Sequence, residues 1–515
     1  MLNRRLWFWR RNECGPMDNP TRPITDLKLG GLVRPLGAVD ALMISGLSVD
    51  SRKTKPGHLF AAMPGTQVHG ATFVSFAQRM GAVAVLTDAE GVALLEAEFG
   101  ALPLPVLVAD DPRRALAYAA AHWFGAQPAN MVAVTGTNGK TSVSNFARQI
   151  FEALGETAVN FGTTGVEGAV TAPLSHTTPE PLTLHKLLAD LTAQGVTHAA
   201  MEASSHGLAQ QRLAAVRLKA AAFSNLTRDH LDYHPTVESY FAAKALLFTE
   251  VLPANGCAVI NIDDPFGVRL AEMATARGQR VLRVGRDPSA DLRIRATRFD
   301  ADGQDLRFEW QGSSHVSRLG LIGGFQAGNA LLAAGLAIGC GAPPNDVFAA
   351  LEQLGTVRGR MQLAATRENG AKVFVDYAHT PDALKTALDA LRPHVLGRLI
   401  VVFGAGGDRD KGKRPLMGAA AAEHADVCIV TDDNPRNEDP ASIRAAVLAA
   451  CPEAVEVGDR AEAILRGIDA AQAGDAVLIA GKGHESGQTV GGDVLPFDDV
   501  EQASMATKAL DGLGL

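Results

Sequence analysis

One stretch of the chain constrains the fold more than any other, the segment at 131–144, Met-Val-Ala-Val-Thr-Gly-Thr-Asn-Gly-Lys-Thr-Ser-Val-Ser. The β-branched run at 132–134 predicts a buried strand, and a helix is predicted from Lys140 to about Leu154, with Gly155 as its stop. A strand, a glycine loop and a helix in this order crowd backbone N–H groups around an anion, and the helix N-terminus adds partial positive charge. The segment therefore predicts an α/β sheet domain that binds phosphate.

The side chains of this loop point to a nucleoside triphosphate with Mg²⁺. Lys140 supplies a full positive charge and the Thr141 hydroxyl is suited to hold the metal. The strict P-loop pattern would have glycine at Val134, so GTNGKT is a shortened variant, and an ordinary strand–helix turn is the alternative. The predicted nucleotide contacts in the loop are Gly136, Thr137, Asn138, Gly139, Lys140, Thr141 and Ser142.

Composition limits the remaining classes of protein. A chain of 515 residues is too long for one core and suggests about three domains, and 47% hydrophobic with 20% charged residues is typical of a globular protein. The net charge of −8 gives no electrostatic footprint for nucleic acid, and no apolar run is long enough to span a membrane. Five scattered cysteines predict reduced thiols in a cytosolic protein: Cys14, Cys257, Cys340, Cys428 and Cys451.

The N-terminal part is expected to be a basic extension followed by a first α/β domain. Residues 1–23 are predicted to be disordered, with Met17 as an alternative start. The domain is predicted at 24–110, with strands at 44–47, 59–63, 82–86 and 106–109. Polar loops at 49–52 and 64–70 follow two of these strands and are either substrate loops or ordinary turns.

Two further domains are predicted, a central P-loop-type ATPase domain with a parallel sheet at 111–356 and a C-terminal Rossmann-like, doubly wound domain at 357–515. The central strands are expected near 132, at 199–201, 221–224 and 257–261, followed by an antiparallel stretch at 292–321 and a helix opened by Asn329. The C-terminal strands are expected at 373–376, 399–403, 427–430 and 477–480. Each ends in a polar, mostly glycine-rich loop, so one sheet edge is predicted to be a binding face.

Three residues outside the loop carry candidate chemistry. Glu202 ends a predicted strand and could take Mg²⁺, although a solvated glutamate is the alternative; His230 follows the next strand end. Lys244 has apolar neighbours on both sides, so burial would lower the pKa of its amine and suit covalent chemistry or carbamylation. A lysine snorkelling from an amphipathic helix is the alternative.

Without reference to any family, these parts indicate ATP, Mg²⁺ and a second substrate distributed over three domains. A zinc hydrolase with a metal-bridging lysine is a second hypothesis, based on Glu202, His206, His230 and His234, but a hydrolase has no use for a phosphate loop. A nucleotide-dependent switch or binding module is a third, and four polar strand ends are excessive for it.

Six ordered motifs resemble those of the Mur ligases of peptidoglycan synthesis, and more closely the members that use 2,6-diaminopimelate. They are GTNGKT at 136–141, MEASSHGL at 201–208, NLTRDHLDYH at 225–234, DYAHTPD at 376–382, GGDRDKGKR at 406–414 and DNPR at 433–436. The resemblance covers nearly everything but the first two dozen residues.

This resemblance implies an ATP-dependent acid–amino-acid (EC 6.3.2 class) amide ligase of cell-wall biogenesis, cytoplasmic and monomeric, linked to cell shape, cell division and the cell cycle. ATP would phosphorylate the D-glutamate side-chain carboxylate of UDP-N-acetylmuramoyl-L-alanyl-D-glutamate, and an amine of meso-diaminopimelate would attack the acyl phosphate. Positioning and electrostatics should dominate such a reaction.

The resemblance also assigns roles by motif. Lys140, Glu202, His230 and Lys244 would be catalytic, and Thr141, Glu202, His230 and carbamylated Lys244 would hold Mg²⁺. The nucleoside would contact Asn329, Arg360 and Asp376. The uridine part would contact Val49, Ser51, Thr66, Gln67 and Val68. The muramoyl-dipeptide part would contact His176, Thr177, Thr178, Ser204, Gln210 and Arg212. Diaminopimelate would contact Arg409, Asp433, Asn434, Pro435, Arg436, Gly481 and Glu485.

Arginine at position 436 has a direct chemical reason in this scheme. A guanidinium binds the distal carboxylate of diaminopimelate bidentately, a group that lysine lacks, and Glu485 takes an ammonium. A turn cap is the alternative role of the DNPR segment. The chain departs from the family at Gln326 and His176, where Asn is usual, and in its N-terminal extension.

Overall fold

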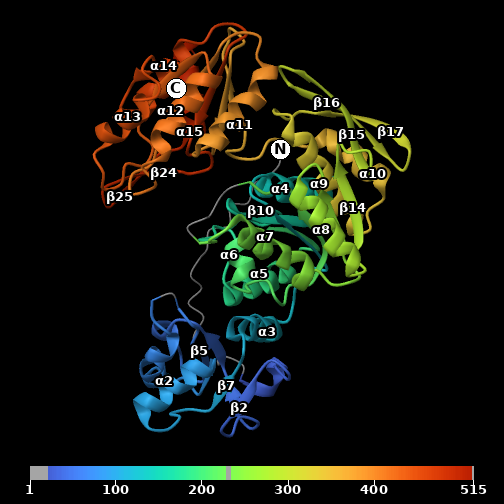
Figure 1. The fold of residues 1–515 in the computed structure, drawn as a ribbon, viewed down its shortest axis with the longest axis vertical. Helices are drawn as coiled ribbons and strands as arrows, with labels where there is room; N and C mark the ends of the chain where they lie inside the picture. Colours follow the sequence, from blue (N-terminus) through green and yellow to red (C-terminus); the bar gives the residue numbers. More distant parts are fainter. Residues whose placement is uncertain (1–20, 66, 228–232, 513–515) are drawn as a thin grey trace. The chain divides into compact units, whose positions relative to one another are not determined.

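The computed structural model describes residues 21–65, 67–227 and 233–512, which form two compact units (Figure 1). The first unit comprises the chain up to Ala126 with Glu180–Ala189 and Gln210–Ala215; the second comprises Gln127–Pro179, Asp190–Ala209 and the chain from Val216. Most of the predicted N-terminal extension lies outside the described residues. The extension was predicted to run to residue 23, but ordered structure begins before that position, because β1 (Arg22–Pro23) pairs antiparallel with β3 (Met43–Ile44).

The first unit is built on a five-stranded sheet in the order β2-β7-β6-β5-β4, in which β4 to β7 are parallel and β2 is antiparallel to β7. Alternate residues of β5 face opposite sides: Leu59 packs with α3, and Phe60 packs with α1 and α2. The strands are β2 (Arg34–Leu36), β4 (Gly46–Ser48), β5 (His58–Ala61), β6 (Ala84–Thr87) and β7 (Val106–Val108), and the helices are α1 (Val74–Arg79), α2 (Ala89–Phe99) and α3 (Pro112–Phe124).

The second unit contains a ten-stranded sheet in the order β10-β9-β11-β8-β12-β13-β14-β15-β16-β17. The neighbouring strands β9, β11, β8, β12, β13, β14 and β15 are parallel, whereas β10, β16 and β17 pair antiparallel with the strands beside them. The bounds are β8 (Asn130–Thr135), β9 (Ala158–Gly162), β10 (Gly165–Gly168), β11 (His198–Glu202), β12 (Leu218–Phe223), β13 (Cys257–Asn261), β14 (Arg280–Gly285), β15 (Leu292–Asp300), β16 (Gly303–Trp310) and β17 (Ser313–Leu319).

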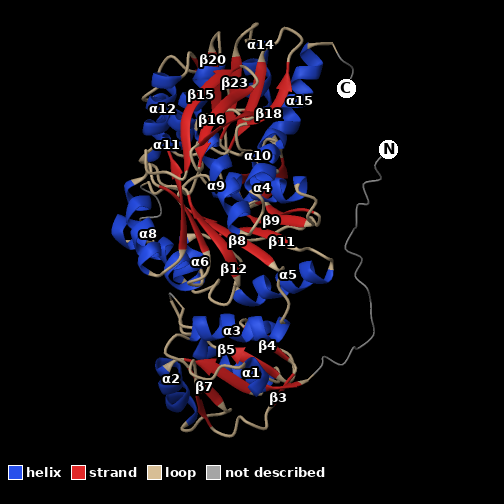
Figure 2. Ribbon diagram, turned by 90° about the vertical axis from the view of Figure 1, so that its right-hand side faces the viewer, coloured by secondary structure: helices blue, strands red, loops and turns tan. Residues whose placement is uncertain are grey.

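Helices α4 and α9 cover one face of this sheet, where Phe146 and Leu331 are fully buried in one cluster with Val132 and Val134 (Figure 2). The helices are α4 (Lys140–Ala153), α5 (Pro181–Ala193), α6 (Ser205–Ala209), α7 (Val237–Leu246), which continues as the π-helical turn Leu247–Val251, α8 (Pro265–Ala276), α9 (Phe325–Gly339) and α10 (Pro344–Ala350). No helix among the described residues is long and apolar enough to cross a bilayer.

The C-terminal part of the second unit is a six-stranded sheet in the order β18-β19-β23-β20-β21-β22, with only the edge strand β18 antiparallel. One face packs on α11, α12 and α13 and the other on α14 and α15 (Figure 2), so the predicted doubly wound arrangement is confirmed. The bounds are β18 (Gln362–Thr366), β19 (Lys372–Asp376), β20 (Leu399–Phe403), β21 (Val427–Val430), β22 (Val455–Glu456), β23 (Ala476–Ala480), α11 (Pro381–Leu391), α12 (Lys413–His424), α13 (Pro440–Leu448), α14 (Arg460–Asp469) and α15 (Asp499–Leu510); a separate hairpin is formed by β24 (Gly487–Val490) and β25 (Asp493–Pro496).

Three local predictions were wrong. The strand predicted at 44–47 is two strands, because Ser45 turns to the Gly57 carbonyl and the chain changes its pairing partner there. Asn329 does not open a helix: α9 begins four residues earlier, after Gly323 and Gly324, and Asn329 lies inside it. The helix α3, assigned from sequence to the central domain, belongs to the first unit, where Leu116 packs in the core of the smaller sheet.

Candidate functional site

The phosphate loop has the predicted strand–loop–helix form, and both of its glycines are required by the space around them. Gly136 and Gly139 have φ angles of +147° and +87°. A Cβ at Gly136 would lie 2.0 Å from Ser224 Oγ, and one at Gly139 would lie 2.7 Å from Asn329 Oδ1. Only glycine therefore allows β12 and α9 to approach the loop this closely.

Neighbouring elements hold the loop in a fixed shape. The backbone N–H groups of Thr137 and Asn138 donate to Asn225 O and Oδ1, at 2.8 and 3.0 Å. Ser224 Oγ donates to Asn138 O at 2.5 Å, and Ser142 is buried in the first turn of α4. Asn225 is a contact that the sequence reasoning missed, although it lies in the NLTRDHLDYH motif.

Two lysines converge on one carbonyl oxygen of the loop. Lys140 Nζ donates to Gly136 O at 3.0 Å and to Thr137 O at 2.8 Å, and Lys244 Nζ donates to Gly136 O at 2.7 Å. Lys244 is 1% exposed and its ammonium lies 4.3 Å from the Tyr240 ring centroid. Lys244 therefore does not snorkel to solvent, and two amines that lie far apart in sequence meet at the loop.

Glu202 is the centre of a hydrogen-bond network beside the loop. It is 1% exposed, and its carboxylate accepts from Thr141 Oγ1 at 3.2 Å, from Thr163 N at 2.8 Å and from Thr163 Oγ1 at 3.1 Å. Thr163 Oγ1 also lies 3.1 Å from Thr177 Oγ1. Glu202 is thus not a solvated strand-end glutamate; it is fixed next to the loop by Thr163, which the sequence reasoning missed.

The segment after β11 is tied back to the same network. Thr178 Oγ1 donates to Glu202 O at 3.0 Å and accepts from Ser204 N at 3.0 Å, and Gly207 N donates to Ser204 Oγ at 3.0 Å. The structure therefore brings together Thr177, Thr178, Ser204 and Glu202, all in the second unit. His176 is exposed and its Nδ1 contacts Ser175 Oγ.

The residues predicted to contact the uridine part lie in the first unit. Val49 and Val68 are 39% and 53% exposed, Gln67 is exposed, and Ser51 begins a short 3-10 helix capped by Asp50. Gln210 and Arg212 also belong to this unit, where the Arg212 guanidinium donates to Gln210 Oε1 at 2.7 Å. Thr66 and His230 lie outside the described residues.

Arg360 links the loop helix to the C-terminal sheet within the second unit. Its guanidinium lies 3.5 Å from Thr141 Oγ1 and 4.5 Å from the Tyr377 ring centroid. Asp376, at the end of β19, accepts from Met361 N at 2.7 Å and from Ala378 N at 2.9 Å; burial raises the pKa of its carboxyl group, and Arg360 opposes that shift. Asn329 Nδ2 donates to Gln326 Oε1 at 3.0 Å, so Gln326 holds the Asn329 side chain inside α9.

Charged side chains cluster at the carboxyl ends of β19, β23, β20 and β21, which are parallel neighbours, and this cluster is called the pocket because ligands of such sheets bind there. Asp433 and Asn434 are 6% and 8% exposed, and Asp433 Oδ1 accepts no hydrogen bond from the described residues. Asn434 Nδ2 donates to Glu485 Oε2 at 3.0 Å. Gly481, at φ +123°, comes close enough that a Cβ there would lie 3.0 Å from Asp433 Oδ2.

Arg436 sits at a left-handed φ of +52°, after the buried Pro435. Its guanidinium Nη1 donates to Gly407 O at 2.8 Å, and its backbone N–H donates to Thr489 O at 3.0 Å in the β24–β25 hairpin. Arg409 is exposed on the loop after β20. The DNPR segment is therefore more than a turn cap, because the hairpin fixes its backbone beside the pocket.

Buried charges beneath this pocket went unnoticed in the sequence. Lys482 is 0% exposed, and Arg460 and Asp499 form an ion pair of 2.7 Å whose side chains are both 0% exposed. Burial, with help from Arg360 and Arg358, lowers the pKa of His484 to about 4, so this imidazole is neutral at physiological pH. The glycine-rich GKGHE context was the only available signal for Lys482.

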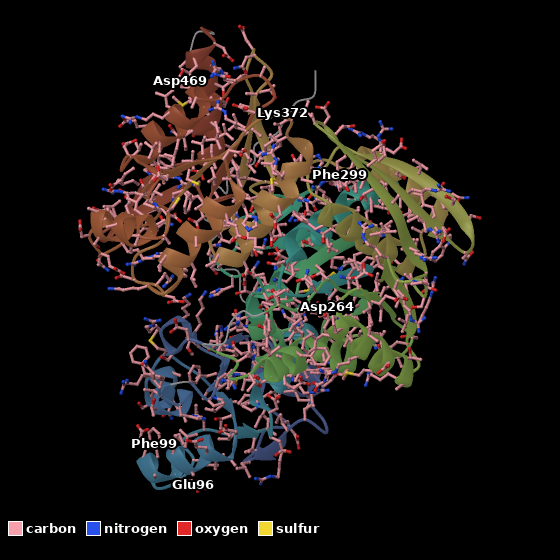
Figure 3. All side chains as sticks on the ribbon, turned by 45° about the horizontal axis from the view of Figure 1, so that its top comes forward. Glu96, Phe99, Asp264, Phe299, Lys372 and Asp469 are labelled. Carbon is pink, nitrogen blue, oxygen red and sulfur yellow. The ribbon has the colours of Figure 1, made fainter. Side chains whose placement is uncertain are left out.

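The metal-hydrolase hypothesis finds no support in the described ranges, which contain no group of three or more His, Cys, Asp or Glu side chains that could hold a metal ion. His206 and His234 instead contact one another and Tyr233 through their rings, with centroid distances of 5.7, 4.0 and 4.9 Å. Asp264, labelled in Figure 3, caps α8 and accepts from Leu226 N at 2.7 Å, so the carboxylate of this residue has a structural role.

Three family models match successive parts of this chain. Residues 43–124 match the Mur ligase family, catalytic domain, residues 134–337 match the Mur ligase middle domain, and residues 359–483 match the Mur ligase, glutamate ligase domain. The central model covers the phosphate loop, Glu202 and Lys244, and the C-terminal model covers the DNPR segment.

Curated relatives are similar over nearly their whole length. A UDP-N-acetylmuramoyl-L-alanyl-D-glutamate–2,6-diaminopimelate ligase of Bradyrhizobium diazoefficiens is 52% identical over 91% of this chain and 96% of the relative. The ligase of the same name from Caulobacter vibrioides is 49% identical over 91% and 96%.

Among solved structures, one described as a UDP-N-acetylmuramoyl-L-alanyl-D-glutamate–2,6-diaminopimelate ligase has a TM-score of 0.71 and 35% identity, covering 95% of this chain and 99% of that chain. The MurF ligase from Thermotoga maritima in complex with ADP has a TM-score of 0.59 and 17% identity, over 90% and 97% of the two chains, and shares the fold.

Proposed function

This chain belongs to the Mur ligase family, and on that premise we propose that it is an ATP-dependent ligase of peptidoglycan precursor synthesis. It joins meso-2,6-diaminopimelate to the D-glutamate side-chain carboxylate of UDP-N-acetylmuramoyl-L-alanyl-D-glutamate. The relatives named for this reaction, 52% and 49% identical over nine-tenths of the chain, support the choice of substrates.

The first step is phosphoryl transfer, in which a carboxylate oxygen of the D-glutamate attacks the γ-phosphorus of ATP and ADP leaves. The loop from Gly136 to Thr141 binds the triphosphate, and Lys140 moves from the loop carbonyls to its β- and γ-oxygens. Asn329, Arg360 and Asp376 contact the nucleoside. Since the transition state spreads negative charge over the phosphoryl oxygens, Lys140 and Arg360 stabilise it electrostatically.

The second step is attack of a neutral amine of diaminopimelate on the acyl-phosphate carbonyl carbon. The C–N bond forms, inorganic phosphate leaves with the bonding electron pair of the C–O bond, and the proton lost by the amine ends on that phosphate. The distal end of the diamino acid is held at the β21 and β23 strand ends, where Arg436 and Arg409 bind its carboxylate and Asp433 and Glu485 accept from its ammonium. Asn434, Pro435 and Gly481 shape this pocket.

The residues beside the loop fit Mg²⁺, which prefers hard oxygen ligands in an octahedron. Thr141 Oγ1 and Glu202 Oε2 lie 3.2 Å apart, close to the separation of about 3 Å between adjacent oxygens of an octahedral magnesium site. We assign the metal to Thr141 and Glu202, to His230 by family resemblance, and to Lys244 as its carbamate. Bound there, Mg²⁺ would neutralise phosphate charge.

Carbamylation explains why Lys244 is buried next to Lys140. Two ammonium groups on one carbonyl oxygen repel each other, whereas a carbamate carries negative charge and binds a cation. The uridine part of the UDP-linked substrate contacts Val49, Ser51, Thr66, Gln67 and Val68, and its muramoyl-dipeptide part contacts Thr177, Thr178, Ser204, Gln210 and Arg212. We further propose that the enzyme is cytoplasmic and monomeric and that its central and C-terminal domains meet near residue 356.

The observation that carries the proposal is the network of Thr141, Glu202, Thr163 and Thr177, because the Glu202 carboxylate contacts Thr141 of the phosphate loop directly and Thr177 through Thr163. The test is product identification by mass spectrometry after incubation with ATP, Mg²⁺, the UDP-linked dipeptide and meso-diaminopimelate. The product should have the summed mass of the dipeptide substrate and diaminopimelate less one water, and it should require all four components. Formation of this product without ATP would refute the mechanism.

A further inference from the structure

Lys482 places a buried ammonium group beneath the amino-acid pocket. Its side chain is 0% exposed, and Nζ donates to Asn434 Oδ1 at 3.0 Å and to Gly487 O at 2.7 Å. The same nitrogen lies 3.7 Å from Asp433 Oδ1 and 3.7 Å from Glu485 Oε2. One cation therefore contacts both carboxylates of the pocket and the amide between them.

These contacts determine which way the Asn434 amide faces. Asn434 Oδ1 accepts from Lys482 Nζ and from Thr489 N, the latter at 2.8 Å, so the oxygen is committed to two donors. The amide nitrogen must then face the other way, where it donates to Glu485 Oε2 at 3.0 Å. Lys482 thus orients Glu485 through Asn434.

Lys482 also sets the charge of the pocket floor. The charged groups that act on it are Asp433, Arg460, Glu485 and Asp499, and Arg460 and Asp499 neutralise each other in their own ion pair. Asp433 and Glu485 against Lys482 leave one negative charge. Asp433 Oδ1, buried and accepting no hydrogen bond from the described part of the chain, is ready to accept from a ligand donor.

We propose that Lys482 is a positioning residue for amino-acid recognition: its ammonium fixes the Asn434 amide and holds the Asp433 and Glu485 carboxylates on one cation, so that they bind the distal ammonium of the incoming diamino acid. The inference rests on the proposed function and adds a specificity-determining residue to it. Without the lysine, the two carboxylates would share the site with no cation between them, and Asn434 Oδ1 would lose one of the two donors that orient the amide.

The test compares three variants of the full chain in steady-state kinetics. Lys482→Met removes the charge and the hydrogen bonds, Lys482→Gln removes the charge and keeps a donor for Asn434, and Lys372→Met is the control. Lys372 lies at the opposite end of the sheet, at the start of β19, where Nζ donates to Ala301 O at 2.6 Å (labelled in Figure 3).

Lys482→Met should raise KM for meso-diaminopimelate about tenfold or more while KM for ATP and for the UDP-linked substrate stays within about twofold. Lys482→Gln should show a smaller rise in KM for diaminopimelate than Lys482→Met, because glutamine keeps a donor for Asn434. Lys372→Met should leave the KM for diaminopimelate unchanged.

Two results would overturn the inference: an unchanged KM for diaminopimelate in both variants, or equal losses for all three substrates. If Lys482→Met fails to fold, Lys482→Gln carries the test, since it also removes the charge and its KM for diaminopimelate should still exceed that of Lys372→Met. Absence of turnover by the unmodified enzyme would contradict the proposed function instead, so the two failures are distinguishable.

Discussion

The buried ion pair beneath the pocket gives the most quantitative prediction. In Asp499→Asn, Arg460 keeps its charge but loses the carboxylate that accepts from Nε at 2.8 Å and from Nη2 at 2.7 Å, with both side chains 0% exposed. Leaving one charge of a buried pair uncompensated costs about 3–5 kcal/mol, and because asparagine retains one acceptor we expect about 3 kcal/mol. Arg460 also donates to Ala480 O at 3.0 Å, next to the pocket, so amino-acid binding should weaken as well.

Urea unfolding followed by circular dichroism measures this loss. The matched control is Glu462→Gln, which breaks the exposed pair with Arg466 on the same helix, whose side chains are 49% and 55% exposed, and should cost less than about 0.5 kcal/mol. The double variant Arg460→Met/Asp499→Leu should recover most of the stability, because no charge remains buried. If Asp499→Asn loses no more stability than Glu462→Gln, the reasoning about this pair is wrong.

Four further predictions follow from the site. Thr163→Val should lower kcat about tenfold or more by removing a hydrogen bond to the Glu202 carboxylate, with the melting temperature as control; an unchanged kcat would exclude a positioning role. Gly136→Ala should abolish ATP binding in calorimetry, because no space exists for its Cβ. Lys244→Ala should be inactive and partly restored by bicarbonate; full activity without additives would contradict the carbamate. Burial lowers the pKa of His394, so the unfolded chain binds its proton more readily: the stability from the neutral ring is present above about pH 6.5 and is lost as pH falls below it. When the pH is lowered from 7.5 to 5.5, the free energy of unfolding measured by urea titration should therefore fall less in His394→Gln than in the unmodified chain.

The His394 prediction depends on a specific tautomer. Its Nε2 accepts from Gly323 N at 3.0 Å, its Nδ1 donates to Asp300 O at 2.6 Å, and its ring lies edge-on to Phe299, labelled in Figure 3, with centroids 5.1 Å apart. Protonation would remove the acceptor and leave the Gly323 N–H unpaired. Equal acid sensitivity in both proteins would refute this account.

Much of the fold could be predicted because the sheets are parallel and covered on both faces. Strands such as 257–261 and 399–403 are continuous apolar runs, and the observed bounds match them. The strand β14 was missed because the exposed Arg280 and the partly exposed Arg283 interrupt the apolar pattern near the edge of the parallel region. Asn329 was mistaken for a helix start because its buried side chain bonds within α9 instead of capping it.

The phosphate loop could be predicted because its chemistry is local, with glycines, lysine and threonine in one short segment. Thr163 could not, since its role depends on the β9–β11 register, which pairs Phe161 with Met201 and so brings the next turn to Glu202. Lys482 was hidden for a similar reason: nothing in its own segment reveals that Asn434, 48 positions away, accepts from it. Roles that depend on pairing across a sheet leave little trace in the sequence.

The most direct measurement of the central claim is phosphate release from ATP in the presence of UDP-N-acetylmuramoyl-L-alanyl-D-glutamate, with either meso-diaminopimelate or L-lysine as the amine. The account predicts turnover with diaminopimelate and a kcat/KM at least about a hundredfold lower with lysine, because lysine leaves Arg436 without its carboxylate partner. Equal use of both amines would contradict the assignment of the pocket, and no turnover with either amine, with ATP bound, would contradict the proposed reaction itself.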